Sequence, residues 1–209
     1  MNSDKKKKVN VSSIVLYSIC VILFLFAAYG IVIKLTNNSI YLFGVRSDAV
    51  LTDSMSYKNE DPIVQEFLKG HDDQLQIGDL TYSEKVTETT KLDVYDIVIF
   101  KNRDNGNETI HRIVEIRDGS DYIDKETRYL IRADAANHES FDGLYRRSEI
   151  IAKYKTKIPF VGHIKIFFSS IYGLILIVGL MIILLVYDFI NTNYIKDKKN
   201  TENKNENKE

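Results

Sequence analysis

Two long runs of uncharged, apolar residues limit what this chain can fold into more than any other feature of its sequence. They cover Ile14–Ile33 and Ile166–Tyr187. A helix of about 20 residues rises about 30 Å, which is the thickness of the hydrocarbon core of a bilayer. A buried helix of a soluble protein usually keeps a polar stripe, and neither run has one. We therefore expect two transmembrane helices, at residues 14–33 and 166–187, on either side of one domain at residues 34–165.

Charged residues beside these runs predict the orientation of the chain. Lys5–Lys8 precede the first run, and basic residues favour the cytoplasmic side of a membrane. Residues 1–13 are then cytoplasmic, residues 34–165 lie outside the cytoplasm, and residues 188–209 return as a disordered, solvated tail. Lysines also crowd the outer flank of the second run, so the first helix decides the orientation. The first run is longer than the apolar part of a cleavable signal peptide, which favours an uncleaved anchor.

Composition excludes several classes of protein. The chain has 28 basic and 29 acidic residues and a net charge of -1, so it is not a nucleic-acid binder that relies on bulk positive charge. Aromatic residues make up 11%, which argues against a wholly disordered chain. The single cysteine, Cys20, lies inside the first apolar run, which excludes an internal disulfide and disfavours thiol catalysis.

Short β-branched and apolar stretches alternate with turn signals between the two runs, which predicts a mainly β, antiparallel domain. The expected strands are Ala49–Thr52, Leu80–Tyr82 continuing to Val86, Ile97–Lys101, Thr109–Ile116, Tyr129–Arg132 and Ile150–Lys153. Asp61–Asp73 has a proline near its start, apolar residues at helical spacing and a late glycine. This segment predicts a short helix inserted after the first strand.

Polar side chains able to do chemistry gather in three segments of this domain. Ser54 follows a β-type run, His111 lies in an expected strand, and a later loop carries Asp134 and Asp142. Strand alternation places His111 on one face and Arg112 on the other. Taken singly, each segment has an ordinary explanation: a turn serine, a hydrogen-bonded structural histidine and a solvated loop.

Taken in order between two membrane runs, the three segments resemble the type I signal peptidases, in the histidine-type branch that includes the eukaryotic microsomal enzyme and relatives in some bacteria and archaea. The matching stretches, from about residue 14 to residue 187, are VLTDSM, IGDLTYSEKV, YDIVIFK, TIHRIVEI, IRADAANHESFDGLY and KIPFVGHI. The slot that holds a lysine in the other branch holds His111 here. The chain departs from the family at Asp53, where a small residue is usual, and lacks a proline after Met55. Its two aspartates are also spaced two residues wider than the family pattern.

The resemblance implies a signal-peptidase-like β fold and a serine endopeptidase. Ser54 is then the nucleophile, His111 the general base and Asp142 its orienting carboxylate, with Asp134 in a supporting role; which aspartate reaches His111 stays open. The backbone N–H of Ser54 is the expected oxyanion donor, and no cofactor or metal is expected. A histidine has an ordinary pKa of about 6.5 and a lysine of about 10.4, so only the lysine must be desolvated to act as a base near neutral pH.

The implied substrates are secretory preproteins, whose N-terminal signal peptides are removed at the outer surface of the lipid bilayer. A glycan on Asn107, in the Asn107-Glu108-Thr109 sequon, would crowd His111. The sequon therefore favours a bacterial plasma membrane over the endoplasmic reticulum. Which preproteins are cut, and whether accessory membrane subunits take part, stays open.

Two other readings of the sequence remain. A two-span receptor or scaffold explains the membrane runs equally well, and Asp53 with the absent proline allows an inactive signal-peptidase homologue. A metal site built from His71, His138 and His163 with neighbouring acidic residues is disfavoured, because no HExxH or similar spacing is present.

Overall fold

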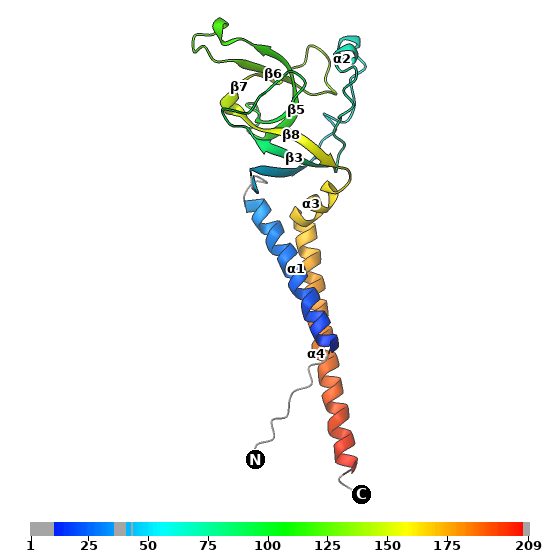
Figure 1. The fold of residues 1–209 in the computed structure, drawn as a ribbon. Coiled ribbons are helices and arrows are strands. Elements are labelled where there is room, and N and C mark those ends of the chain that lie inside the picture. Colours follow the sequence, from blue (N-terminus) through cyan, green and yellow to red (C-terminus); the bar gives the residue numbers. More distant parts are fainter. Residues whose placement is uncertain (1–10, 36–40, 43, 207–209) are drawn as a thin grey trace. The chain divides into compact units, whose positions relative to one another are not determined.

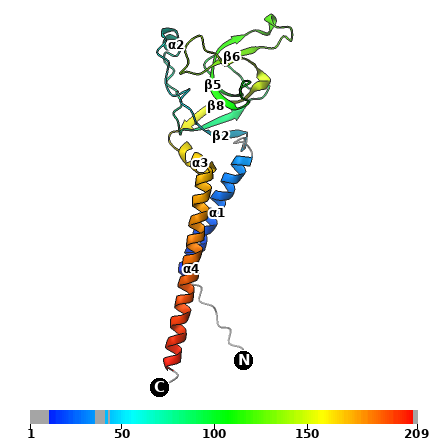
Figure 2. The ribbon, with the colours of Figure 1, turned by 180° about the vertical axis from the view of Figure 1, so that it is seen from behind.

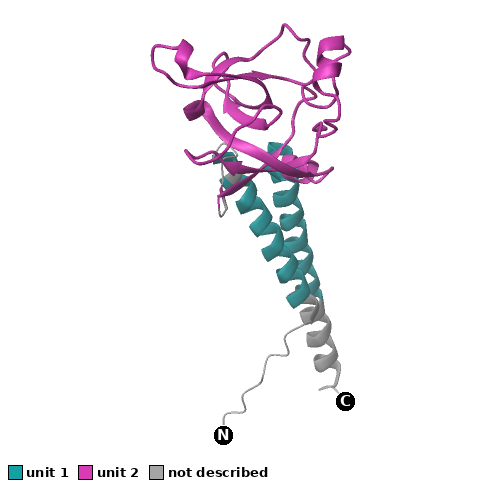
Figure 3. Cartoon of the chain, turned by 45° about the horizontal axis from the view of Figure 1, so that its top comes forward, with its two compact units in different colours: residues 1–35, 167–209 teal, residues 36–166 magenta. Residues whose placement is uncertain are grey.

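The computed structural model describes residues 11–35, 41–42 and 44–206, which belong to two compact units (Figure 3). One unit holds residues 1–35 and 167–209 and is helical. The other holds residues 36–166 and carries the β-strands. Lys5–Lys8, from which the orientation of the chain was predicted, lie outside the described residues.

The helical unit contains two helices that are long and apolar enough to cross a membrane. Helix α1 (Val11–Leu35) includes a candidate span at Ile14–Val32 with a mean hydropathy of 2.5. Helix α4 (Ile171–Glu206) includes one at Ile171–Tyr194 with a mean hydropathy of 2.7. Only 22% and 11% of these windows are buried. Core helices of a soluble protein are mostly buried, so this exposure fits helices that cross a membrane. In the sequence, a mainly β domain lies between these two membrane-compatible helices.

The second apolar run differs from the single helix expected at residues 166–187. Helix α3 (Gly162–Ser169) ends inside this run, and a second helix, α4, begins at Ile171. The Ser170 hydroxyl donates to the carbonyl of Phe167 (2.8 Å) and accepts from the N–H of Gly173 (2.9 Å). Serine side chains compete with the helical backbone for hydrogen bonds and favour helix starts, which explains the break.

The C-terminal segment also differs from its expected disorder. Helix α4 continues without interruption to Glu206, whereas the sequence predicted a disordered tail from residue 188. A helix that is already nucleated adds each further residue at little cost, because the expensive first turn has been formed. Lysine and glutamate are good helix formers, so the polar composition of the tail does not oppose that extension.

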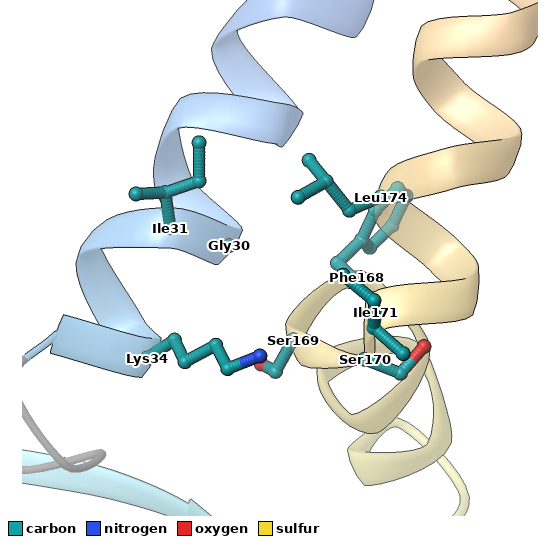
Figure 4. Close-up of a pocket in the computed structure, with 8 residues that line it drawn as sticks. All are labelled: Gly30, Ile31, Lys34, Phe168, Ser169, Ser170, Ile171 and Leu174. Atoms are coloured by element: carbon teal, nitrogen blue, oxygen red, sulfur yellow. The ribbon is translucent and has the colours of Figure 1, made fainter.

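Helix α1 packs closely against the end of α3 and against α4 (Figures 1 and 4). A Cβ atom added to Gly30 would lie 2.2 Å from the carbonyl oxygen of Phe168, so only glycine fits there. The rings of Phe26 and Phe168 stack with centroids 4.7 Å apart. The Tyr17 hydroxyl donates to Asp188 (2.9 Å). Figure 4 shows the small pocket left at this helix crossing, lined by Gly30, Ile31, Lys34, Phe168, Ser169, Ser170, Ile171 and Leu174.

We expect Gly30→Ala to destabilise the helical unit, because its methyl group must displace the Phe168 carbonyl. Overpacking of this kind costs about 1–3 kcal/mol. Gly179→Ala is the matched control, since nothing lies within 4 Å of its added Cβ. Thermal unfolding of the full chain in detergent micelles should show a lower midpoint for Gly30→Ala alone. Equal midpoints for the two variants would contradict this account of the packing.

The second unit is built on one curled antiparallel sheet of eight strands in the order β1-β2-β3-β8-β4-β5-β6-β7 (Figures 1 and 2). Its strands and one α-helix are β1 (Tyr41–Leu42), β2 (Val45–Ala49), α2 (Pro62–Phe67), β3 (Leu80–Lys85), β4 (Ile97–Lys101), β5 (Glu108–Arg117), β6 (Arg128–Arg132), β7 (Gly143–Arg146) and β8 (Ile150–Ile158). Two single-turn 3₁₀ helices, Gly119–Asp121 and Arg147–Glu149, complete it.

The first expected strand is shifted, and two strands were not expected. The strand predicted at Ala49–Thr52 corresponds to β2, which begins earlier, at Val45, and already ends at Ala49. Beyond it, the Val50 backbone pairs with Asp79 and Gly78 (both 2.9 Å), and a turn follows. Strands β1 and β7 are too short to give an alternating pattern.

Alternation along β4 and β5 supplies two separate cores. Val98 faces His111 across the strand pair, and Ile97 faces Arg112. The first face joins the core cluster of Leu92, Val98, Phe100, Ile113, Tyr129, Ile131, Tyr145 and Ile150. The second joins the cluster of Val50, Met55, Leu75 and Ile97. His111 and Arg112 therefore enter opposite sides of the sheet, as strand alternation predicts.

Candidate active site

Ser54 lies in a tight turn directly after β2. The N–H of Ser56 donates to the carbonyl of Asp53 (2.9 Å), which closes the turn. The next side chain, Met55, is only 1% exposed and fills the second core cluster. The Met55 carbonyl accepts from the N–H of Leu75 (2.7 Å). Burial of Met55 therefore fixes the turn and leaves the Ser54 hydroxyl at a partly open position.

His111 forms a hydrogen bond with the Ser54 hydroxyl through one ring nitrogen and with the Asp142 carboxylate through the other. Its Nε2 lies 3.0 Å from Ser54 Oγ, and its Nδ1 lies 2.7 Å from Asp142 Oδ2. The histidine is buried against Phe100, whose ring centroid is 6.1 Å away. A carboxylate only accepts, so it places the proton on Nδ1 and leaves Nε2 free to accept from Ser54. The three residues form a hydrogen-bonded triad.

Asp142 is held by its own backbone. Its N–H donates to the carbonyl of Ile131 (2.9 Å), and its carbonyl accepts from the hydroxyl of Tyr145 (3.2 Å). Tyr145 is buried in the first core cluster. The carboxylate therefore projects toward His111 from a loop that is anchored to β6 and β7. This answers which of the two predicted aspartates reaches the histidine.

Asp134 does not touch His111, so its place in the site differs from that of a catalytic residue. It is 2% exposed and binds Arg112 through two hydrogen bonds of 2.8 and 2.7 Å. Asp73 binds the same guanidinium at 2.7 and 3.1 Å. These three side chains, Arg112, Asp73 and Asp134, are named the buried ion cluster below. Asp134 is kept away from His111 because strand alternation turns Arg112 and its partners to the face opposite His111.

Electrostatics in the buried ion cluster favour the charged forms. Burial disfavours a charged guanidinium, but the hydrogen bonds that Arg112 donates to Asp134 and Asp73 outweigh it and raise the pKa of Arg112. Burial likewise opposes ionisation of Asp73, and the hydrogen bonds from Arg112 outweigh it and lower the pKa of that carboxyl. Sequence analysis placed Arg112 on this face but gave it no role, because its partners come from distant segments.

The buried ion cluster is connected to Ser54 through the backbone. The N–H of Ala135 donates to the carbonyl of Ser54 (3.0 Å), and the N–H of Asn59 donates to the carbonyl of Asp134 (2.9 Å). The N–H of Asp134 also lies 3.4 Å from the sulfur of Met55. The loop that carries both aspartates is thus tied to the turn that carries Ser54, which keeps the hydroxyl within reach of His111.

Thr52 is a further polar group at the site that the sequence did not reveal. Its hydroxyl lies 3.2 Å from the Ser54 hydroxyl. Among the described residues, the backbone N–H of Ser54 has no protein acceptor. The backbone N–H of Ser54 is therefore open to a ligand. The Thr52 hydroxyl donates to Ser54 Oγ while Ser54 donates to His111, and rotation of this hydroxyl would turn its proton toward a ligand beside Ser54 Oγ. A turn threonine has no sequence signal that separates it from an ordinary surface residue.

The remaining histidines do not gather around a metal. His71 stacks on Tyr95 with ring centroids 4.1 Å apart, and His138 binds Asp61 (2.5 Å). His163 packs against Gly78. In the ranges that the structure describes, no group of three or more His, Cys, Asp or Glu side chains could hold a metal ion.

Comparison with known proteins adds no relative. No model of a known protein family matches the chain, and a search of curated proteins finds no match either.

The two aspartates should separate activity from stability. We expect Asp134→Asn to lower the free energy of unfolding by about 3 kcal/mol, because it leaves Arg112 buried with one charged partner fewer. Asp142→Asn should leave unfolding almost unchanged, because the amide oxygen of asparagine can still accept the hydrogen bond from His111 Nδ1. Denaturant unfolding of the full chain in micelles measures both. A stable Asp134→Asn protein would refute the structural role given to this residue.

Proposed function

We propose that this chain is a membrane-anchored serine endopeptidase of the type I signal peptidase kind, with a histidine base. One observation carries the proposal: Ser54, His111 and Asp142 are joined by hydrogen bonds of 3.0 and 2.7 Å in the order that nucleophilic catalysis needs. The three residues lie 57 and 31 positions apart in the chain. A receptor or scaffold does not need a serine, a histidine and an aspartate that are joined in this order, so we prefer the enzyme.

The triad performs peptide hydrolysis in two steps. Ser54 Oγ attacks the scissile carbonyl while His111 Nε2 takes its proton, and Asp142 stabilises the imidazolium that forms. His111 then gives that proton to the leaving amine, which releases the C-terminal product and leaves an acyl group on Ser54. Water, activated by the same histidine, hydrolyses this ester and restores the serine. The oxyanion in each step is received by the Ser54 N–H and the Thr52 hydroxyl.

Open strand edges offer a place for an extended substrate. Among the described strands, residues Glu108–His111 of β5 pair with β4 alone, because pairing with β6 starts at Arg112. In the part of the chain that the structure describes, β2 beyond Arg46 likewise pairs with β3 alone. These two edges lead to His111 and to Ser54, and the ion pair of Arg46 with Glu108 (2.7 Å) joins them. A peptide that adds a strand here presents its carbonyl to Ser54.

The two membrane-compatible helices suit substrates whose apolar segment is already in a bilayer. Such substrates diffuse in two dimensions and present their cleavage site near the surface, so proximity supplies part of the rate. Secretory preproteins have this form. We place the enzyme in a bacterial plasma membrane with its β domain outside the cytoplasm, on the charges and the sequon that the sequence provides.

Removal of either end of the proton path tests the proposal directly. Ser54→Ala and His111→Ala should each lower the cleavage of a preprotein by about 10⁴-fold or more. Ser56→Ala is the matched control, because its hydroxyl donates only to the Asp53 carbonyl (2.7 Å). Cleavage is followed by the appearance of the mature N-terminus in detergent or vesicles. Wild-type rates in both triad variants would dismiss the enzyme. No cleavage by a folded wild-type chain on any preprotein would favour the inactive homologue.

The Thr52 hydroxyl should matter to rate more than to binding. Thr52→Val keeps the shape of the side chain and removes its donor, so we expect kcat to fall by about 10²-fold with little change in KM. Thr52→Ser restores the hydroxyl and should recover most of the rate. A loss that serine fails to rescue would mean that the methyl group is what matters, and would exclude the oxyanion role.

A further inference from the structure

One buried arginine in the β domain lacks the partners that all the others have. The described residues include four buried arginines: Arg46, Arg112, Arg128 and Arg132. The first three bind carboxylates, which are Asp48 and Glu108, Asp73 and Asp134, and Asp124 and Glu126 respectively. Arg132 is 4% exposed, yet its side chain forms no ion pair or hydrogen bond within the described chain, and its Nε is buried without an acceptor.

The surroundings of Arg132 hold its guanidinium without neutralising it. Its central carbon lies 5.7 Å from the ring centre of Phe67 and 5.9 Å from that of Phe141. Aromatic faces attract a cation but offer no acceptor for its N–H groups. Burial lowers the pKa of Arg132, although Asp134 and Asp61 favour its charge from a distance. By contrast, the paired partners of Arg112 raise the pKa of that guanidinium.

The two nearby carboxylates are already committed to other groups. Asp134 accepts two hydrogen bonds from Arg112 and one from Gln74. Asp61 caps helix α2 through the N–H of Ile63 (2.9 Å) and binds His138. An unpaired buried charge costs several kcal/mol, and neither carboxylate forms a hydrogen bond with Arg132 while it holds these partners. An acceptor from outside the chain would therefore stabilise this guanidinium.

Arg132 is linked to the triad through the segments that hold it. Its side chain lies on the same face of the sheet as Arg112, its cross-strand partner, and the carbonyl of the preceding residue, Ile131, accepts from the N–H of Asp142 (2.9 Å). Phe141, one of its two rings, directly precedes Asp142 and is 45% exposed. The guanidinium therefore lies between the loop of the triad carboxylate and helix α2, at a site with an open aromatic wall. A planar fork of N–H donors fits a carboxylate in two-point contact better than any other common group of a peptide.

We propose that Arg132 selects substrates with an acidic side chain, aspartate or glutamate, among the first residues after the scissile bond. This inference rests on the proposed function. The side of the bond follows from chemistry: the substrate segment before the cut is anchored in lipid, where a carboxylate is costly. The segment after the cut is released into water and can carry the charge. Phe67 and Phe141 flank the acidic side chain and keep water from competing for the guanidinium.

Paired substrates test the selection in the full chain in micelles. Preprotein substrates that differ only by Glu or Gln, placed at successive positions after the scissile bond, are cut by the wild type and by variants. At one position we expect kcat/KM to be about 10-fold higher for Glu, the value of one charge-assisted hydrogen bond. Arg132→Met should bring the Glu/Gln ratio at that position to one. Arg132→Lys, which keeps the charge but loses the fork, should give an intermediate ratio.

Arg117→Met is the matched control, because Arg117 is an exposed arginine that pairs with Glu115 (2.8 Å). It should keep both the wild-type rate and the wild-type ratio. A wild-type chain without a preference for Glu at any position overturns the inference, whether or not the variants fold. A preference that survives in Arg132→Met overturns it as well.

A binding measurement separates this inference from the proposed function. If the wild type cuts no preprotein, the same Glu and Gln pairs are bound to the full-length Ser54→Ala protein and followed by fluorescence anisotropy. Tighter binding of Glu that disappears when Arg132→Met is added supports the acidic subsite even though the hydrolase has failed. Equal binding of the two overturns the subsite.

Discussion

Neutralising the guanidinium of Arg112 is the constraint on which the site depends. This side chain is 0% exposed, and a charge buried so deeply is stable only beside opposite charges with good geometry. Asp73 and Asp134 meet it at 2.7 Å. Asp73 lies in the segment that follows Ser54, and Asp134 lies in the loop that precedes Asp142. The buried ion cluster on one face of β5 therefore holds together the segments that carry Ser54 and Asp142, which are the partners of His111 on the other face. Because Arg112 and His111 are adjacent in the strand, neither face can shift alone.

The segment Asp61–Asp73, whose purpose the sequence left open, acts as a brace in this arrangement. Asp61 caps α2 and binds His138 in the loop between the two aspartates, and His138 keeps the pKa of Asp61 low, at about 2. At the far end of the segment, Asp73 enters the buried ion cluster. Between these ends, Phe67 stacks on Tyr95 with centroids 4.7 Å apart. One insert thus ties the loop of the triad carboxylate to the sheet at several points.

How much the sequence could predict depended on how local the cause was. Hydropathy located both membrane-compatible helices, a short run of apolar and β-branched residues located β4, and alternation along β5 predicted the opposite faces of His111 and Arg112. The break at Ser170 was missed, since an apolar run does not reveal how one hydroxyl caps a helix. Strand β7 and the choice between Asp134 and Asp142 were also out of reach. That choice depends on a single backbone hydrogen bond from Asp142 to Ile131 (2.9 Å), which no residue pattern encodes. Thr52 became visible only when the turn brought its hydroxyl beside Ser54.

The wide spacing of the two aspartates, which departs from the signal-peptidase pattern, has a physical explanation in the loop itself. The loop is fixed at one end by the bond from Ala135 to the Ser54 carbonyl and at the other by Asp142 on Ile131. Between these points the chain makes a turn, in which the N–H of Ser140 donates to the carbonyl of Asn137 (3.2 Å), and it contacts Asp61 through His138. Extra residues in a loop with fixed ends lengthen its outer part at small entropic cost and need not move the ends. The insert that receives His138 gives that outer part a partner. The longer loop therefore leaves the Asp142 carboxylate within hydrogen-bond distance of His111 (2.7 Å), and the spacing is no argument against the triad.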